Sequence, residues 1–95
     1  MDNYTIAQRL TAYAHHLEES APSLYRSRAY RRAASTLLGL DRPAAEIVAA
    51  EGRKGLQALP GIGAHLAYTI EELVRTGEFR TFDQRNQPAS GRRAG

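Results

Sequence analysis

Apolar residues recur every three or four positions along most of the chain, a pattern typical of amphipathic helices. The first stripe predicts a helix over about residues 3–19, with Asp2 or Asn3 as its N-cap. The adjacent His15 and His16 point in different directions around such a helix, so we expect them to be exposed or partly packed, not joint ligands of one metal ion. The apolar members of the stripe are Ile6, Leu10, Tyr13, Ala14 and Leu17.

A second helix is predicted over about residues 24–38, with Ser23 as its N-cap and Gly39 as the C′ residue that ends it. One side of this helix carries residues against which another helix can pack closely: Tyr30, Ala33, Ala34 and Leu37. The opposite side carries Arg28, Arg31, Arg32 and Ser35. The helix is therefore predicted to bury one face and to present a basic face.

Shorter helices are predicted downstream. Pro43 suits the first turn of a helix over about residues 44–50, and residues 51–55 are predicted to form a loop. A helix over about residues 64–76 is expected to end at Gly77, and Phe79 and Phe82 are spaced so that a further turn can dock them on the core. The pattern as a whole predicts an all-α protein, a compact bundle of four to five short helices.

A tight hairpin, Pro60-Gly-Ile-Gly63, joins two of the predicted helices. Pro60 is expected to end the first of them, because its ring and missing N–H cannot continue the helical ladder. Gly61 and Gly63 are expected to allow positive backbone torsions and a close approach. The helix that starts at Gly63 or Ala64 directs backbone N–H groups and the positive end of its dipole outward, which suits an anion such as a phosphate.

Composition fits one small domain. The chain has 95 residues, of which 42% are hydrophobic, enough for one modest helical core. Residues 1–85 are predicted to form the domain, and residues 86–95, without apolar periodicity, a flexible basic tail. The net charge of +3 is weak evidence for an anionic partner, because Arg92 and Arg93 fall in the tail.

Cysteine is absent, which excludes disulfides and thiolate metal sites. The first residues lack the basic and apolar segments of a signal peptide, and no stretch is long and apolar enough to span a membrane. We therefore expect a soluble cytoplasmic protein, associated with the nucleoid, that does not bind a membrane.

The segment from Tyr25 to Arg32 interleaves four arginines with two tyrosines. Guanidinium groups match the geometry of phosphates, and aromatic rings can stack on unpaired bases. This segment is the best side-chain candidate for nucleic-acid contact, with a solvated basic face as the alternative.

The pattern Leu56-x-x-Leu-Pro-Gly-Ile-Gly-x-x-x-Ala-x-x-Ile70 resembles the helix-hairpin-helix motif of DNA repair and replication proteins. In that motif the glycine hairpin holds the sugar-phosphate backbone through main-chain amides. The resemblance implies that Gly61, Ile62, Gly63 and Ala64 bind DNA phosphates without reading bases. The alternative is a helical hairpin that only packs.

A longer resemblance covers about residues 3–82. The run Tyr25-Arg-Ser-Arg-Ala-Tyr-Arg-Arg-Ala-Ala34, followed by the hairpin and Glu71-Glu-Leu-Val-Arg-Thr-Gly77, resembles the amino-terminal domain of family X DNA polymerases. In that family the domain is a small helical bundle that binds the 5′-phosphate side of a DNA gap. Some members also remove a 5′-deoxyribose phosphate through a Schiff base.

The resemblance implies a role for several residues. It places Arg26, Tyr30 and His65 at the 5′-phosphate pocket, and Tyr25 where a ring can stack on a template base. It also implies that the backbone carbonyls of the hairpin can coordinate a monovalent cation, Na+ or K+, that bridges to a phosphate. These carbonyls belong to Gln57, Leu59 and Ile62.

The chemistry of the lyase reaction is not supported. Its Schiff base needs an amine, and the position that holds the lysine in the family is Thr69 here. The chain has one lysine, Lys54, in the segment before the hairpin. The polymerase catalytic carboxylates are also missing, and we expect Glu71 and Glu72 to be solvated. The sequence therefore predicts a protein that is not an enzyme.

The sequence as a whole predicts non-sequence-specific DNA binding, at gaps, nicks or 5′-phosphorylated ends during DNA repair, with a polymerase or repair protein as a further partner. Side-chain contacts to phosphates are expected from Arg26, Arg28, Arg31, Arg32, Tyr30 and His65. Two alternatives stay open. One is a weak 5′-deoxyribose phosphate lyase that uses Lys54 or the α-amino group, and the other is a protein-interaction scaffold that does not bind DNA.

Overall fold

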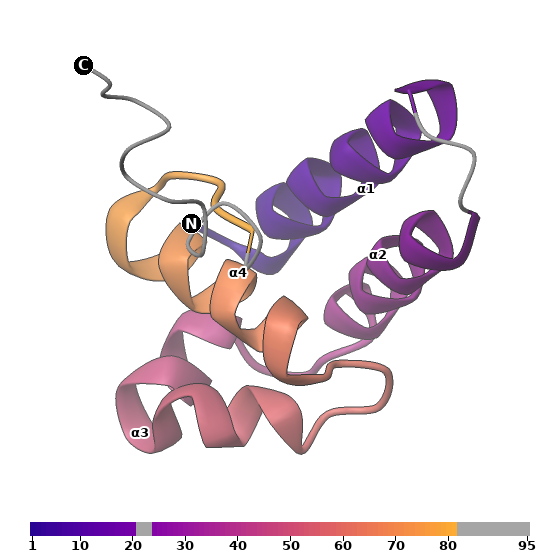
Figure 1. Ribbon diagram of the computed structural model, residues 1–95. Coiled ribbons are helices and arrows are strands. Elements are labelled where there is room, and N and C mark those ends of the chain that lie inside the picture. The colour runs from indigo at the N-terminus through magenta and orange to yellow at the C-terminus, as the bar shows by residue number, and fades with distance from the viewer. Residues whose placement is uncertain (21–23, 82–95) are drawn as a thin grey trace, which may run out of the picture.

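The computed structural model describes residues 1–20 and 24–81, and all regular structure in these ranges is helical. Figure 1 shows α1 and α2 as one antiparallel pair and α3 and α4 as a second, with α4 between α3 and the first pair. The helices are α1 (Asn3–Ser20), α2 (Leu24–Leu38), α3 (Ala44–Gln57) and α4 (Ala64–Thr76). The predicted all-α bundle is therefore confirmed. No helix in the described ranges is long and apolar enough to cross a lipid bilayer.

One core joins the four helices, and it is made of the apolar stripes that the sequence predicts. Each core residue exposes only a few per cent of its surface, because dispersion and the hydrophobic effect favour close packing of apolar side chains. The most buried of them are Ile6, Leu10, Ala14, Ala33, Leu37, Ala44, Leu56, Ala67, Ile70 and Leu73.

Asp2 and Asn3 divide two capping roles between them. The Oδ1 atom of Asp2 accepts a hydrogen bond of 2.8 Å from the amide of Thr5, so Asp2 is the N-cap of α1. The side chain of Asn3 instead bonds to the backbone around the start of α3, about forty residues away in the sequence. Its Oδ1 accepts a hydrogen bond of 2.7 Å from the amide of Ala44, and its Nδ2 donates one of 3.0 Å to the carbonyl of Arg42. The start of α1 is thereby fastened to the start of α3.

Helix α3 is longer than the sequence indicated. The predicted loop over residues 51–55 is too long: only Gly52 leaves the helical conformation, and a second helical segment follows it and continues to Gln57. Gly52 has φ 69° and ψ −158°, a conformation open to glycine because it has no Cβ. The backbone is helical again after Gly52. This glycine therefore divides α3 into two helical segments and does not begin a longer loop.

The hairpin between α3 and α4 is a β-turn over residues 59–62. The amide of Ile62 donates a hydrogen bond of 3.2 Å to the carbonyl of Leu59, with Pro60 and Gly61 at the two central positions. Gly61 has φ 77°, as the third residue of a type II turn requires. Two details of the prediction are wrong. Helix α3 already ends at Gln57, before Pro60, and Gly63 has an extended backbone with φ −91°.

Helix α2 holds this hairpin from the side. The hydroxyl of Thr36 donates a hydrogen bond of 2.7 Å to the carbonyl of Pro60. The side chain of Arg32 lies against Gly61, so closely that a Cβ on the glycine would be 2.9 Å from Cγ of the arginine. The basic helix and the glycine hairpin therefore form one surface.

The chain after α4 returns to the α1–α2 pair. Helix α4 ends at Gly77 as predicted, and the amide of Gly77 donates a hydrogen bond of 2.9 Å to the carbonyl of Leu73. Phe79 docks on the core as predicted, with its ring centroid 4.9 Å from that of Tyr13 and 6.3 Å from that of Tyr30, and the described residues 78–81 are not helical. The predictions for Ser23, Phe82 and the tail over residues 86–95 lie outside the described residues.

Glu71 is not solvated, contrary to expectation. It is buried, and its carboxylate pairs with Arg53 at 2.8 Å and with Arg75 at 3.0 Å. The guanidinium of Arg53 also lies over the ring of Tyr68, 5.6 Å from its centroid. Two arginines thus compensate one buried charge, and the pair with Arg53 joins the second segment of α3 to α4, whereas the pair with Arg75 lies within α4.

An exposed ion pair joins α1 to α2. The guanidinium of Arg31 donates hydrogen bonds of 2.8 and 2.9 Å to the two carboxylate oxygens of Glu18. This bidentate contact favours the ionised carboxylate and lowers the pKa of Glu18 to about 2.

The variant Glu18→Gln should melt at a lower temperature than the wild type at pH 7, and the difference should almost disappear at pH 2. The pKa of Glu18 is lower in the folded state than its ordinary value of 4.5, so the pair stabilises the fold above about pH 4.5. That contribution is lost as the pH falls toward 2. Thermal unfolding followed by circular dichroism measures both temperatures. A carboxyl pKa near 4.5 for Glu18 in an NMR titration would contradict the pairing.

The variant Gly61→Ala should lower the free energy of unfolding by about 1 to 2 kcal/mol, because a Cβ is strained at positive φ. Gly39→Ala is the matched control. Gly39 has no positive φ, and a Cβ there would be no closer than 3.7 Å to the neighbouring carbonyl oxygens. Urea denaturation of both variants checks this, and equal losses at the two positions would contradict the turn geometry.

Candidate nucleic-acid interface

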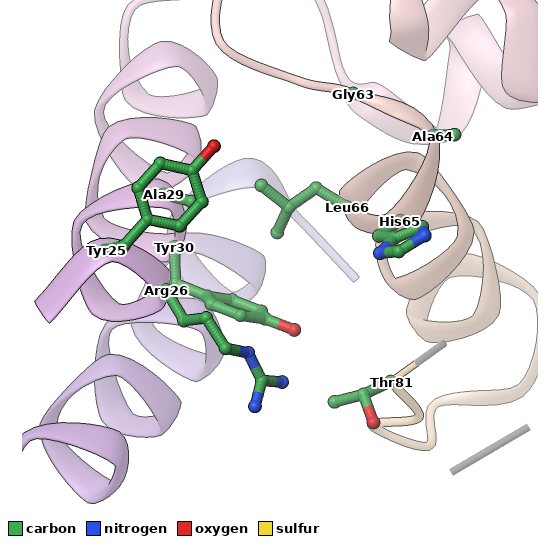
Figure 2. Close-up of a pocket in the computed structure, with 9 residues that line it drawn as sticks. All are labelled: Tyr25, Arg26, Ala29, Tyr30, Gly63, Ala64, His65, Leu66 and Thr81. Atoms are coloured by element: carbon green, nitrogen blue, oxygen red, sulfur yellow. The ribbon is translucent and has the colours of Figure 1, made fainter. Parts of the chain in front are cut away.

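A pocket of about 610 Å³ opens between the first half of α2 and the start of α4. Figure 2 shows side chains from the two helices directed toward one another across it, with Thr81 closing one side. The pocket is lined by Tyr25, Arg26, Ala29, Tyr30, Gly63, Ala64, His65, Leu66 and Thr81. The sequence prediction named six of these nine residues, and the fold brings those six together.

The α4 side of the pocket is the start of a helix. Gly63 is its N-cap, with an extended backbone and no side chain to cap the first turn. Gly63, Ala64 and His65 are exposed, and a Cβ on Gly63 would meet no atom within 4 Å. The amides of a first helical turn have no partner within the helix, so an anion can approach this end closely.

The α2 side supplies a guanidinium and a phenol. Arg26 and Tyr30 lie one helical turn apart on α2, and Arg26 and Thr69 are close enough to the phenol of Tyr30 to lower its pKa, against the larger effect of burial. Burial of the ring, followed by the neighbouring Tyr13, raises the pKa of Tyr30, so the phenol keeps its proton near neutral pH. The pocket therefore presents hydrogen-bond donors from both helices.

The electrostatics of the pocket favour an anion. Arg26 contributes a positive charge, the start of α4 adds the positive end of a helix dipole, and none of the nine described lining residues is acidic. Among the described residues no group of three or more histidine, aspartate or glutamate side chains is placed to hold a metal ion. The arrangement thus suits a phosphate bound through amides, a guanidinium and a phenol.

The rest of the lining is apolar. Ala29 and Leu66 form part of the wall, and the ring of Tyr25 stands at the mouth with 82% of its surface exposed. Sequence reasoning missed Ala29, Leu66 and Thr81 as lining residues. Leu66 carries only a core signal in the sequence, and Thr81 reaches the pocket because the chain turns back after α4; Phe79 signals that return, but nothing in the sequence places Thr81 beside α2.

The other predicted arginines do not line the pocket. Arg31 is engaged with Glu18, Arg32 lies against Gly61, and Arg28 is exposed on α2. Gly61 is exposed on the hairpin outside the pocket, whereas Ile62 is buried in the core. The basic helix thus serves two places, the pocket and the outer face of the hairpin.

Neither amine named for a lyase reaction lines the pocket. Thr69 is fully buried, and its hydroxyl donates a hydrogen bond of 3.3 Å to the carbonyl of His65. Lys54 is exposed on α3, and neither it nor Met1 is among the lining residues.

The carbonyls named for a monovalent cation lie where α3 passes into the hairpin. That of Leu59 accepts the amide of Ile62 and keeps a second lone pair, so the turn is compatible with a cation at this carbonyl. The cation site stays a prediction.

Comparison with known proteins agrees with this geometry at the level of the family. No curated protein matches the chain significantly. The model of the helix-hairpin-helix domain family matches residues 1–79, which include all four helices and every described lining residue of the pocket except Thr81. The chain belongs to the helix-hairpin-helix domain family.

Proposed function

We propose that this domain binds DNA without sequence specificity, and that it prefers gaps, nicks and 5′-phosphorylated ends. Helix-hairpin-helix domains generally bind DNA non-specifically. The observation that carries the finer proposal is the pocket, in which Arg26, Tyr30 and the start of α4 face one another and no described lining residue is acidic.

The size and shape of the pocket favour a terminal phosphate over an internal one. A phosphate inside a strand is flanked by sugars on both sides, so it can lie along an exposed surface but enters a pocket with difficulty. A 5′-terminal phosphate is attached on one side only and carries more negative charge. The pocket between α2 and α4 suits this terminal phosphate. Contacts to the phosphate recognise its charge and do not distinguish one base sequence from another.

The outer face of the hairpin suits the remaining backbone. Gly61 is exposed there, with Arg32 against it and Arg28 further along α2. Arginines and main-chain amides of this kind position a strand through its phosphates. A Na+ or K+ ion on the carbonyls of Gln57, Leu59 and Ile62 would add a positive charge beside such a phosphate.

The resemblance to the amino-terminal domain of family X DNA polymerases supports the same proposal. It adds a context, DNA repair, and a class of partner, a polymerase or another repair protein. We propose that the domain delivers such a partner to a gap by holding the 5′ side.

The variant Arg26→Ala should weaken binding to a gapped duplex with a 5′-phosphate by roughly tenfold to a hundredfold, since a charge-assisted hydrogen bond contributes about 1.5 to 3 kcal/mol. Binding to an intact duplex should change much less. Fluorescence anisotropy at two salt concentrations measures both, and the affinity for either DNA should fall as salt rises. An equal loss on both duplexes would exclude the pocket as the end-binding site.

Two matched variants separate the pocket from general charge. Arg28→Ala removes one positive charge from the same helix outside the pocket, so it should weaken binding to the gapped duplex and to the intact duplex equally. Gly63→Ser adds a hydroxyl that can cap the first turn of α4, so it should keep the fold stable and weaken only phosphate-dependent binding. Absence of salt-sensitive binding to any DNA would favour the protein-interaction scaffold.

We further propose that the domain does not catalyse removal of a 5′-deoxyribose phosphate. The chain has one lysine, Lys54, which does not line the pocket, and Thr69 cannot form an imine. Sodium borohydride should therefore trap no cross-link between the protein and an oligonucleotide that carries a 5′-deoxyribose phosphate. A trapped cross-link would overturn this proposal, and its loss in the variant Lys54→Ala would assign the nucleophile to Lys54 and not to the α-amino group.

A further inference from the structure

The pocket is larger than a phosphate requires. Its volume of about 610 Å³ falls within the range of about 300 to 1,000 Å³ that is usual for sites that enclose a whole small molecule. A site for the phosphate alone needs only the amides of the first turn of α4 and the guanidinium of Arg26. The remaining space has to be accounted for by another part of the ligand.

The two halves of the pocket differ in chemistry. Arg26 and Tyr30 form a polar row along α2, since residues four apart lie on the same side of a helix. Tyr25 and Ala29 form the neighbouring row, which is apolar, and Leu66 of α4 faces it across the pocket. A ligand that fills both halves carries a phosphate at one end and an apolar or aromatic group at the other.

Tyr25 indicates which apolar group fits. Its ring stands at the mouth of the pocket with 82% of its surface exposed, on the helical turn that also carries Arg26. An exposed aromatic ring beside a phosphate site is a stacking platform for a nucleic-acid base, because every base has a flat face of this kind. The phosphate and the base then belong to one nucleotide.

We propose that the pocket takes the whole 5′-terminal nucleotide of a strand, unpaired, with its phosphate against Arg26 and the start of α4 and its own base stacked on Tyr25. This inference rests on the proposed function and deepens it. A nucleotide bound in this way has left the duplex, so ends whose first nucleotide is already unpaired bind more tightly than ends that must first be opened.

The test uses single-stranded 5′-phosphorylated trinucleotides with either a normal or an abasic first residue. Because no complementary strand is present, a template base cannot contribute to the stacking. Chemical-shift titrations by NMR measure dissociation constants up to the millimolar range for the wild type and for Tyr25→Ala. Tyr25→Phe keeps the ring, and Tyr4→Ala removes another exposed tyrosine, on α1, as the matched control.

Loss of the base should weaken binding to the wild type by roughly fivefold or more, the low end of base–aromatic stacking. Tyr25→Ala should produce a similar loss with the normal trinucleotide and almost no further loss with the abasic one. Tyr25→Phe and Tyr4→Ala should bind like the wild type. Tyr25 is exposed, so its removal should leave the circular dichroism spectrum unchanged.

Two other results are distinguishable. If the 5′-phosphate strengthens binding but the base and Tyr25 act independently of one another, the terminal nucleotide does not occupy the pocket, and the end-binding function stands without it. If the 5′-phosphate has no effect on the trinucleotide or on the gapped duplex, the proposed function fails, and this inference fails with it.

Discussion

The β-turn over residues 59–62 is the constraint on which the arrangement of the site depends. The hydrogen bond between Ile62 and Leu59, with Gly61 at positive φ, reverses the chain within a few residues and sends α4 back along α3. Helix α2 holds the turn from outside, through Thr36 on Pro60 and Arg32 on Gly61. The start of α4 is therefore directed at α2, and the pocket between them follows from this direction.

Helix α2 contacts three different parts of the structure: the core, α1 and the pocket. Its alanines and Leu37 pack into the core, Arg31 holds α1 through Glu18, and Arg26 faces the pocket. These contacts are compatible because residues around a helix point in different directions. The arginines of α2 are close together in the sequence but lie in different surroundings. The number of positive charges in the segment therefore overstates how many arginines line the pocket.

Long-range polar contacts stabilise the helices in their relative positions. Asn3 joins the start of α1 to the start of α3, and the ion pair between Glu71 and Arg53 joins α4 to α3. Each contact satisfies a polar or charged group that would otherwise be costly where it lies. The domain has a small core, so such contacts contribute a larger share of its stability than they would in a larger protein.

The sequence alone determined the parts of this protein that depend on neighbouring residues. Apolar periodicity predicted the helices, Gly77 the end of α4, and the Leu-Pro-Gly-Ile-Gly pattern the hairpin, because each is set by local backbone preferences. The ion pair between Glu71 and Arg53, the hydrogen bonds of Asn3 to the start of α3 and the position of Thr81 at the pocket were decided by the tertiary structure. Each of these depends on which helices meet and at what angle, and residues far apart in the chain carry no local signal of that.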